Sequence, residues 1–254
     1  MIFRISSVKS AVIFGAGHGI GLALLKQLNE SNSEALIFAT YRNKEKAREL
    51  LDYSISFPEK IKLFQVNPSI ESEIEEIKQS IASQTKSIDL IINSIGFLQD
   101  SNMGPEKSLR DINYENLLKS FQINSIITPM IAKHFTSLLT NSEISLLATV
   151  SAKVGSIEDN RLGGWYGYRA SKAALNMFIK TIAIEYQRNK KRIIVVSLHP
   201  GTTITELSKP HIARSKLKLH TPQETAKNLL KVIDETSLDN SGGFYSWDGS
   251  ELPW

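Results

Sequence analysis

The chain has 254 residues, of which 41% are hydrophobic and 22% charged, a composition that excludes disordered and fibrous proteins. It contains no cysteine, which excludes disulfide bonds, thiolate metal sites and a cysteine nucleophile. The net charge is only +4, and the basic residues are dispersed among acidic ones, so we expect no nucleic-acid partner. The five histidines lack HxxxH or HExxH spacing, and no run of about 18 apolar residues occurs. We therefore expect no metal, no membrane partner and a cytoplasmic location.

Short apolar runs of strand length alternate with segments of helical spacing along the whole chain. Several of these runs are continuous in Ile, Leu and Val, which is typical of parallel strands covered by helices on both faces. The pattern predicts an α/β fold: a single doubly wound Rossmann-type domain over residues 1–254, with a mainly parallel seven-stranded sheet flanked by helices. The predicted strands are Ala11–Phe14, Ala35–Tyr41, Ile61–Val66, Ile88–Ile92, Ile144–Val150, Ile193–Leu198 and Phe244–Trp247.

A glycine-rich turn follows the first predicted strand and leads directly into a segment of helical spacing. It reads Gly15-Ala16-Gly17-His18-Gly19-Ile20-Gly21, a GxxxGxG spacing rather than GxGxxG. Glycines allow positive φ and close approach of phosphate, while the free N–H groups and dipole of the following helix favour an anion. The turn therefore predicts a nucleotide site, although a tight turn without ligand has the same glycines.

The end of the second predicted strand indicates which nucleotide binds. A free ribose 2′-hydroxyl usually requires an acidic residue there, but the sequence runs to Arg42 with no acid until Glu45. Arg42 offers a planar fork to a 2′-phosphate, and His18 adds a donor. We expect NADP rather than NAD, with a solvated arginine as the alternative.

Two segments after strands look like loops, at the strand ends where open α/β sheets bind ligands. One is Asn93–Asp111 and the other Thr202–Thr221. The second contains a basic cluster within Lys209–His220, which either closes over an anionic ligand or is simply solvated. Its cationic and histidine members are Lys209, His211, Arg214, Lys216, Lys218 and His220.

A YxxxK pair places a phenol and an ammonium one helical turn apart, and the chain has two such pairs. Tyr186 and Lys190 lie at a predicted helix end among other cations, where the dipole and solvent suit them. Tyr168 and Lys172 instead open a helix after a glycine-bearing loop, and Ser151 lies before them, just past a buried strand. Context favours the second pair as the chemical site.

Five motifs in chain order resemble those of the short-chain dehydrogenase/reductase family, and they span the chain from end to end. Within that family, "GGWYGYRASKAALNM" and the ending "SGGFYSWDGSELPW" resemble the C-factor-like group, some of whose members are described as signalling proteins. The five motifs are the Gly15/Gly19/Gly21 turn, "NSIG" at Asn93–Gly96, Asn124, the set Ser151/Tyr168/Lys172, and "HPGTTIT" at His199–Thr205.

The resemblance implies a catalytic set of Asn124, Ser151, Tyr168 and Lys172. Tyr168 is then the general acid that protonates the carbonyl oxygen, and Ser151 holds that oxygen. Lys172 lowers the phenol pKa, ordinarily about 10, and bonds the nicotinamide ribose. Asn124 kinks its helix around a water that relays protons to Lys172.

The resemblance also implies which residues shape the cofactor cleft. Asn67 stands where the family commonly has Asp, and its side-chain carbonyl can still accept from the adenine amine. Ile95 is bulkier than the family's Ala, which predicts a tighter adenosine pocket. The expected cofactor-binding residues are Gly15, His18, Gly19, Ile20, Gly21, Arg42, Asn67, Asn93, Gly96, Tyr168, Lys172, Pro200, Gly201, Thr203 and Thr205.

The 17-residue gap from Ser151 to Tyr168 exceeds the family norm, so we expect a longer loop, Ala152–Gly167, over the active site. Trp165 and Tyr166 in that loop either contact substrate or pack beneath it.

We expect an NADP(H)-dependent oxidoreductase of small-molecule carbonyl or alcohol substrates. The alternative is a non-enzymatic NADP-binding signalling or regulatory protein of C-factor type. Family members often assemble through two long helices, here near Asp111–Thr140 and Tyr168–Gln187, so we expect a homodimer or homotetramer. The apolar residues of the first helix that could serve either an interface or the core are Leu117, Leu118, Phe121, Ile126, Met130 and Ile131.

Overall fold

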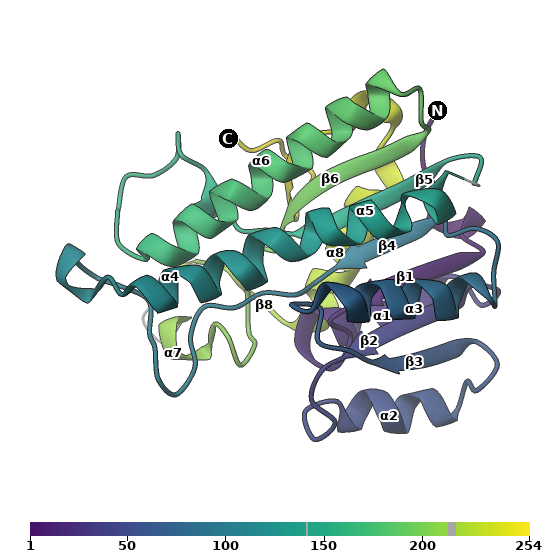
Figure 1. Ribbon diagram of the computed structural model, residues 1–254, viewed down its shortest axis with the longest axis horizontal. Coiled ribbons are helices and arrows are strands. Elements are labelled where there is room, and N and C mark those ends of the chain that lie inside the picture. Colours follow the sequence, from purple (N-terminus) through teal and green to yellow (C-terminus); the bar gives the residue numbers. More distant parts are fainter. Residues whose placement is uncertain (141, 213–216) are drawn as a thin grey trace.

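A seven-stranded sheet forms the centre of the computed structural model, which describes residues 1–140, 142–212 and 217–254 (Figure 1). Its strand order is β3-β2-β1-β4-β5-β6-β9, and every neighbouring pair is parallel. All seven predicted strands are confirmed, with ends shifted by no more than two residues. The strands are β1 (Ser10–Phe14), β2 (Leu36–Tyr41), β3 (Ile61–Gln65), β4 (Leu90–Asn93), β5 (Ser145–Val150), β6 (Ile193–His199) and β9 (Phe244–Ser246).

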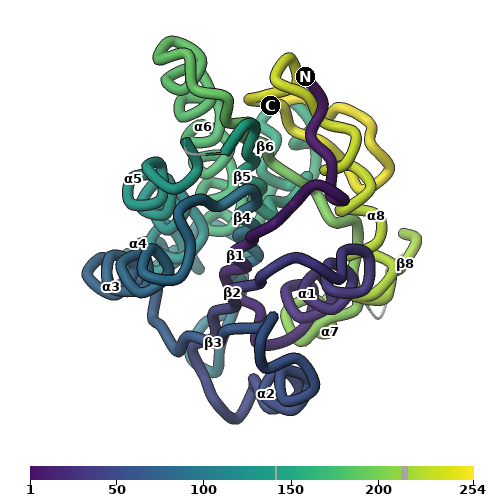
Figure 2. Tube along the Cα trace, turned by 90° about the vertical axis from the view of Figure 1, so that its right-hand side faces the viewer, coloured from purple at the N-terminus to yellow at the C-terminus, as the bar shows by residue number. Residues whose placement is uncertain are grey.

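Helices cover both faces of this sheet, which confirms the doubly wound α/β fold (Figure 2). One face carries α1 (Gly19–Ser31) and α8 (Pro222–Glu235), which pack against each other. The opposite face carries α3 (Glu71–Ala82), α4 (Tyr114–Phe121), α5 (Ile127–Leu139) and α6 (Tyr166–Arg188), while α2 (Arg48–Ile55) lies beside β3.

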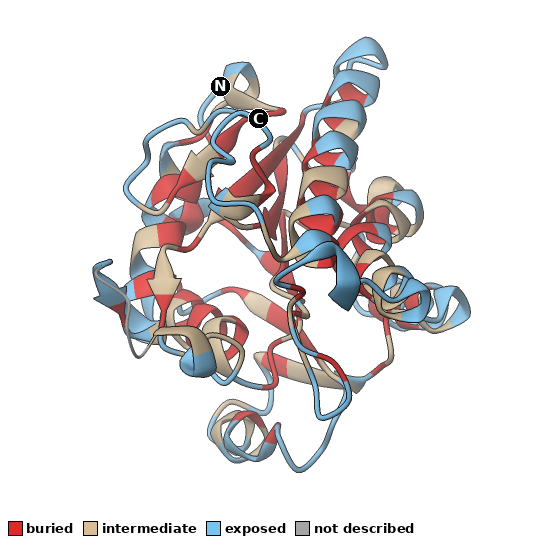
Figure 3. Ribbon diagram, turned by 90° about the vertical axis from the view of Figure 1, so that its left-hand side faces the viewer, coloured by how far each residue is buried: buried red, intermediate tan, exposed pale blue. Residues whose placement is uncertain are grey.

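The central strands β1, β4 and β5 are buried along their whole length (Figure 3). They are covered on both faces because successive side chains enter two separate apolar layers. In β1, Ala11 and Ile13 pack into the layer under α1 and α8, while Val12 and Phe14 pack into the layer under α3, α5 and α6. This explains why the sequence shows continuous apolar runs rather than alternation. Strand order reverses between β2 and β4 on either side of β1, so the crevice of the fold opens beside the end of β1.

The expected loop Thr202–Thr221 is more ordered than predicted. It contains β7 (Thr202–Thr203) paired in parallel with β8 (Leu219–His220), and the short helix α7 (Lys209–Ile212). Elements of two to four residues are too short to produce a recognisable periodicity, which is why the sequence pattern missed them. Arg214 and Lys216 of the basic cluster lie outside the described residues.

The other expected loop, Asn93–Asp111, follows β4 and is irregular until a 3-10 turn at Leu109–Asp111. No helix in the described ranges is both long enough and apolar enough to cross a membrane.

Candidate active site

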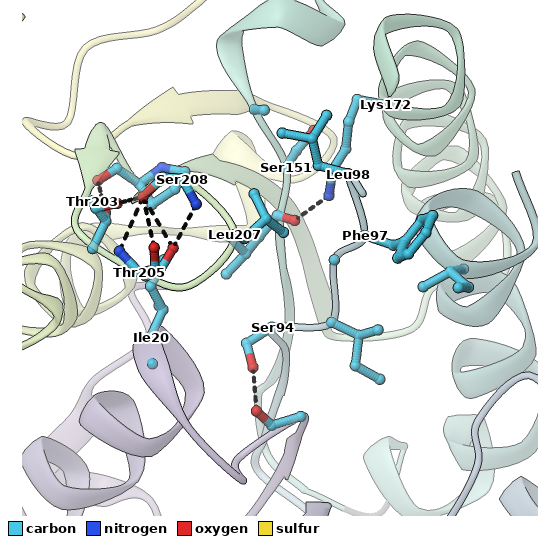
Figure 4. A pocket seen from close by; sticks show the side chains of 18 of the residues that line it. Ile20, Ser94, Phe97, Leu98, Ser151, Lys172, Thr203, Thr205, Leu207 and Ser208 are labelled. Atoms are coloured by element: carbon cyan, nitrogen blue, oxygen red, sulfur yellow. Dashed lines mark hydrogen bonds between the residues drawn. The ribbon is translucent and has the colours of Figure 1, made fainter. Parts of the chain in front are cut away.

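A cavity of about 660 Å³ opens at the carboxyl ends of the central strands, where the crevice of the sheet lies (Figure 4). Segments that follow β1, β2, β4, β5 and β6 line it, together with the start of α6 and the segment around α7. Every expected site residue lines this cavity except Asn93 and Asn124. Those that do are Gly15, His18, Gly19, Ile20, Gly21, Arg42, Asn67, Gly96, Ser151, Tyr168, Lys172, Pro200, Gly201, Thr203 and Thr205.

The glycine turn between β1 and α1 is held tightly against its neighbours. Gly15 has φ +81°, and its N–H donates to Thr40 Oγ1 on β2 at 3.1 Å. A Cβ atom on Gly21 would lie 2.2 Å from the carbonyl oxygen of Gly15, so no larger residue fits there. The first residues of α1, Gly19 to Gly21, line the cavity, and the N–H groups of a first helical turn favour an anionic group.

Positively charged side chains lie where β2 ends at the cavity rim. Arg42 is exposed there, as expected for a residue that meets a phosphate. Lys46 also lines the cavity, and its Nζ forms a 2.8 Å ion pair with Glu206 from the segment after β7. The pKa of His18 is lowered, chiefly because its ring is partly shielded from water. The negative charge of Glu206 raises this pKa, whereas the positive charges of Lys46 and Arg42 lower it further. Lys46, in the turn that precedes α2, and Glu206 were not among the expected site residues.

The start of α6 places Tyr168 and Lys172 on one wall of the cavity, one turn apart. Lys172 is buried, its Nζ donates to Val150 O at 3.0 Å, and it lies 5.9 Å from the centre of the Tyr168 ring. Ser151 directly follows the same stretch of β5. The phenol, the ammonium and the hydroxyl expected to act together therefore face one space.

Burial shifts the titration of both groups on α6. It raises the pKa of Tyr168 to about 12 and lowers the pKa of Lys172 to about 7. The shift of Tyr168 is opposite to the one expected from a neighbouring ammonium, because removing water from the phenolate has the larger effect. At neutral pH the phenol thus holds its proton, while Lys172 is near its midpoint.

Asn124 lies behind the cavity wall rather than on it. It sits in a π-helical turn, Gln122–Ile126, between α4 and α5, so the interruption of this helix is present. Its Nδ2 donates to Phe97 O at 2.8 Å and to Ser171 Oγ at 3.0 Å, and its Oδ1 accepts from Phe97 N–H at 2.8 Å. Asn124 therefore fixes Phe97, which does line the cavity, to the helix that carries Tyr168.

Two further asparagines differ in their relation to the cavity. Asn93 is buried beneath it, where its Nδ2 donates to Thr128 Oγ1 at 2.9 Å and its Oδ1 accepts from Ile95 N–H at 3.1 Å. It shapes the cavity only through Ile95, which lines it as expected. Asn67 lines the cavity directly, and its Oδ1 already accepts from Ser69 N–H at 3.3 Å.

Aromatic and apolar side chains form the wall around Tyr168. Trp165, in a left-handed conformation with φ +52°, packs edge-on against Tyr168 with ring centres 6.1 Å apart. It also packs against His211 of α7 at 5.1 Å, and His211 Nε2 donates to Gln99 Oε1 at 2.9 Å. Trp165 thus belongs to the cavity wall, whereas Tyr166 does not line it.

The second YxxxK pair lies away from the cavity, but not in the environment expected for it. Tyr186 is buried in the core, 3% exposed, and its hydroxyl bonds Thr136 Oγ1 at 2.6 Å. The prediction of a solvated tyrosine was wrong, because its ring faces inward toward α5 although its sequence neighbours are charged.

Three more polar residues support the site, and of these only His199 belongs to a motif of the sequence. His199 lines the cavity, accepts from Lys153 N–H at 3.2 Å through Nδ1, and has its pKa lowered to about 4, chiefly by burial. Asn176 accepts from the Ser151 hydroxyl at 2.8 Å. The buried carboxylate of Glu106 accepts from Gly167 N–H at 3.1 Å and so caps the start of α6. Each contact joins distant segments, which leaves no local signal in the sequence.

The described part of the chain contains no group of three or more His, Asp or Glu side chains placed to hold a metal ion.

Comparisons with known proteins identify solved structures of the same fold and a family whose model matches the chain. The family model described as short chain dehydrogenase matches residues 9–216. The carbonyl reductase Sniffer of D. melanogaster is 26% identical with a TM-score of 0.86, over 97% of this chain and 99% of that one. The NADPH-bound carbonyl reductase from chicken fatty liver is 25% identical with a TM-score of 0.87, over 99% of this chain and 100% of that one.

Among relatives compared by sequence, an uncharacterized oxidoreductase of Schizosaccharomyces pombe is 28% identical over 95% of this chain and 96% of its own length. The C-signal protein of Myxococcus xanthus is 29% identical over 67% of this chain and 95% of its own length. The family match covers most of the chain. The chain therefore belongs to the short-chain dehydrogenase family.

Proposed function

We propose that this protein is an NADP(H)-dependent oxidoreductase that reduces the carbonyl group of a small molecule to an alcohol, or catalyses the reverse. The observation that carries the proposal is that Ser151, Tyr168 and Lys172 share one cavity with the glycine turn. The likeness to an NADPH-bound carbonyl reductase over the whole chain supports it.

The residues of the cavity fit this cofactor. Gly21 leaves no room for a side chain, and the start of α1 supplies N–H groups for a pyrophosphate. We expect Arg42 to meet a 2′-phosphate, together with His18, and Asn67 to meet the adenine. The remaining cofactor contacts that we propose are Gly15, Gly19, Ile20, Gly96, Tyr168, Lys172, Pro200, Gly201, Thr203 and Thr205, with Asn93 acting through Ile95.

When bound, the cofactor supplies the hydride. The side chains of this chain hold the carbonyl oxygen and supply its proton. Ser151 holds the carbonyl oxygen through its hydroxyl. Tyr168 donates its phenolic proton to that oxygen, since its raised pKa keeps it protonated at neutral pH. Lys172, whose pKa of about 7 lets it gain or lose a proton readily, restores the phenol. Asn124 holds Phe97 against α6, beside these groups, through hydrogen bonds to both.

Turnover with a carbonyl panel tests the proposal. We expect purified protein to oxidise NADPH with aromatic or branched aliphatic aldehydes and ketones, because Phe97, Leu98, Trp165 and Leu207 make the wall apolar. Tyr168→Phe should bind NADPH but not turn over. Binding of NADPH without turnover on any member of the panel would contradict the enzymatic proposal.

The likeness to the C-signal protein supports a second candidate, a non-enzymatic NADP-binding signalling or regulatory protein. In that case a cellular role would survive Tyr168→Phe although turnover is lost. If the role disappears together with turnover, this second candidate is wrong.

We also propose that the protein assembles as a homodimer or homotetramer through two long helical stretches. One is α4 and α5 with the π-helical turn between them, and the other is α6. Ile131 is fully buried in the core, but other apolar residues of these helices are exposed. Light scattering at micromolar concentration tests this, and a monomeric mass would refute it. The exposed residues are Tyr114, Leu118, Ile126, Met177, Phe178 and Ile184.

One sheet takes its strands from residue 10 to residue 246, which supports the proposal that residues 1–254 act as one domain. A single cooperative unfolding transition is the expected result, and two separate transitions would contradict it. A cytoplasmic location stays a prediction, which cell fractionation tests.

A further inference from the structure

A buried amide joins the serine of the active site to a second serine outside the cavity. Asn176 projects from α6 one turn beyond Lys172 and lies between Ser151, after β5, and Ser197 on β6. Both serine hydroxyls donate to Asn176 Oδ1, each at 2.8 Å. All three side chains are buried, and Asn176 is only 3% exposed. Within the described ranges, the hydrogen bond that links Asn176 to the expected catalytic residues is the one to the Ser151 hydroxyl.

The nitrogen of this amide is left without a partner in the described part of the chain. An amide nitrogen carries two hydrogens, and burying both without an acceptor is costly. Rotating the amide by a half turn would direct those two hydrogens at the two serine oxygens, which can both accept. The hydroxyls of Ser151 and Ser197 can therefore hydrogen-bond to the amide nitrogen as well as to the amide oxygen.

The two orientations have opposite consequences for Ser151. With Oδ1 toward the serines, the hydroxyl hydrogen of Ser151 is donated to Asn176, and only its lone pairs face the cavity. With Nδ2 toward them, Ser151 accepts from Asn176, and its hydrogen is free to donate into the cavity. Reduction of a carbonyl builds negative charge on oxygen, which requires a donor at that position.

We propose that Asn176 is a positioning residue that sets whether Ser151 donates its hydroxyl hydrogen to the substrate's carbonyl oxygen. The productive orientation directs Nδ2 at Ser151 and Ser197, and Ser197 acts as the second anchor that holds the amide between the two strands. This inference rests on the proposed reductase function.

Asn176→Asp tests the inference because a carboxylate has the same shape but can only accept, which keeps the Ser151 hydrogen turned away from the cavity. With NADPH and a benzaldehyde as probes, we expect kcat to fall about 100-fold with little change in KM, as for loss of one donor to an oxyanion. Asn189→Asp, the same change at the exposed end of α6, should leave kcat unchanged.

A double variant separates action through Ser151 from any other effect of the new charge, including one on Lys172. If Asn176 acts through Ser151, Asn176→Asp should cost no further activity in a Ser151→Ala background. A further loss of tenfold or more in that background would overturn the inference.

Nuclear magnetic resonance of protein labelled with ¹⁵N-asparagine tests the orientation without turnover or the aspartate variant. We expect Ser151→Ala and Ser197→Ala each to shift a different hydrogen of one slowly exchanging side-chain amide. Equal small shifts of both hydrogens, or none, would overturn the inference. If wild-type protein turns over no carbonyl compound, the proposed function fails, while this measurement still decides how the amide is turned.

Discussion

Arg42 is the residue whose replacement should separate the two nicotinamide cofactors most clearly. It lies exposed at the cavity rim just beyond β2, and no carboxylate is ion-paired with it in the described part of the chain, whereas Lys46 is paired with Glu206. Arg42→Ala removes a planar cation that we expect to bond the 2′-phosphate of NADPH.

The size of the effect follows from this exposure. A hydrogen bond to a charged group contributes about 1.5–3 kcal/mol, and an exposed site belongs at the lower end of that range. A loss of about 1.5–2 kcal/mol weakens NADPH binding about 10- to 30-fold. Glu206→Gln should act in the opposite direction, by up to about fivefold, because it frees Lys46 from an exposed ion pair.

Fluorescence titration with NADPH and with NADH measures these changes. NADH lacks the phosphate, so its affinity should stay within about twofold in Arg42→Ala. The matched control is Arg48→Ala, the same loss of charge on α2 at a residue that does not line the cavity. Equal weakening of both cofactors by Arg42→Ala, or equal weakening of NADPH by the control, would refute the reasoning.

Three further predictions concern the catalytic helix and the glycine turn. Tyr168→Phe should lower kcat at least about 100-fold while leaving the NADPH dissociation constant unchanged; retained turnover would exclude the phenol as the general acid. Because burial lowers the pKa of Lys172 from 10.5 to about 7, the unfolded chain binds one proton more between these pH values. Stability should therefore rise by about 1.4 kcal/mol per pH unit within that window, and urea unfolding of Lys172→Met should lack this contribution; equal slopes would contradict it. Gly21→Ala should cost about 1–3 kcal/mol of stability, since its Cβ would lie 2.2 Å from Gly15 O. Gly104→Ala should cost far less, because its Cβ would meet no atom within 4 Å beyond its chain neighbours; similar unfolding midpoints for the two variants would count against the steric argument.

The amino-acid sequence by itself determined the strands, their parallel arrangement and most of the cavity wall. Continuous apolar runs mark strands buried on both faces, and the glycine turn, Ser151 and the Tyr168 pair each follow from neighbouring residues. These features are local: a strand end, a turn that needs positive φ, or two side chains one helical turn apart. The family motifs are readable from the sequence for the same reason.

Only the tertiary structure decided how these pieces are paired and how they titrate. The Lys46–Glu206 ion pair and the bond from Ser151 to Asn176 join residues on separate elements. Tyr186, among charged neighbours in the sequence, proved to be a core residue. Burial also set the sign of the pKa shift of Tyr168. Solvent exclusion and long-range contact depend on every segment packed around a group, so no window of the sequence contains them.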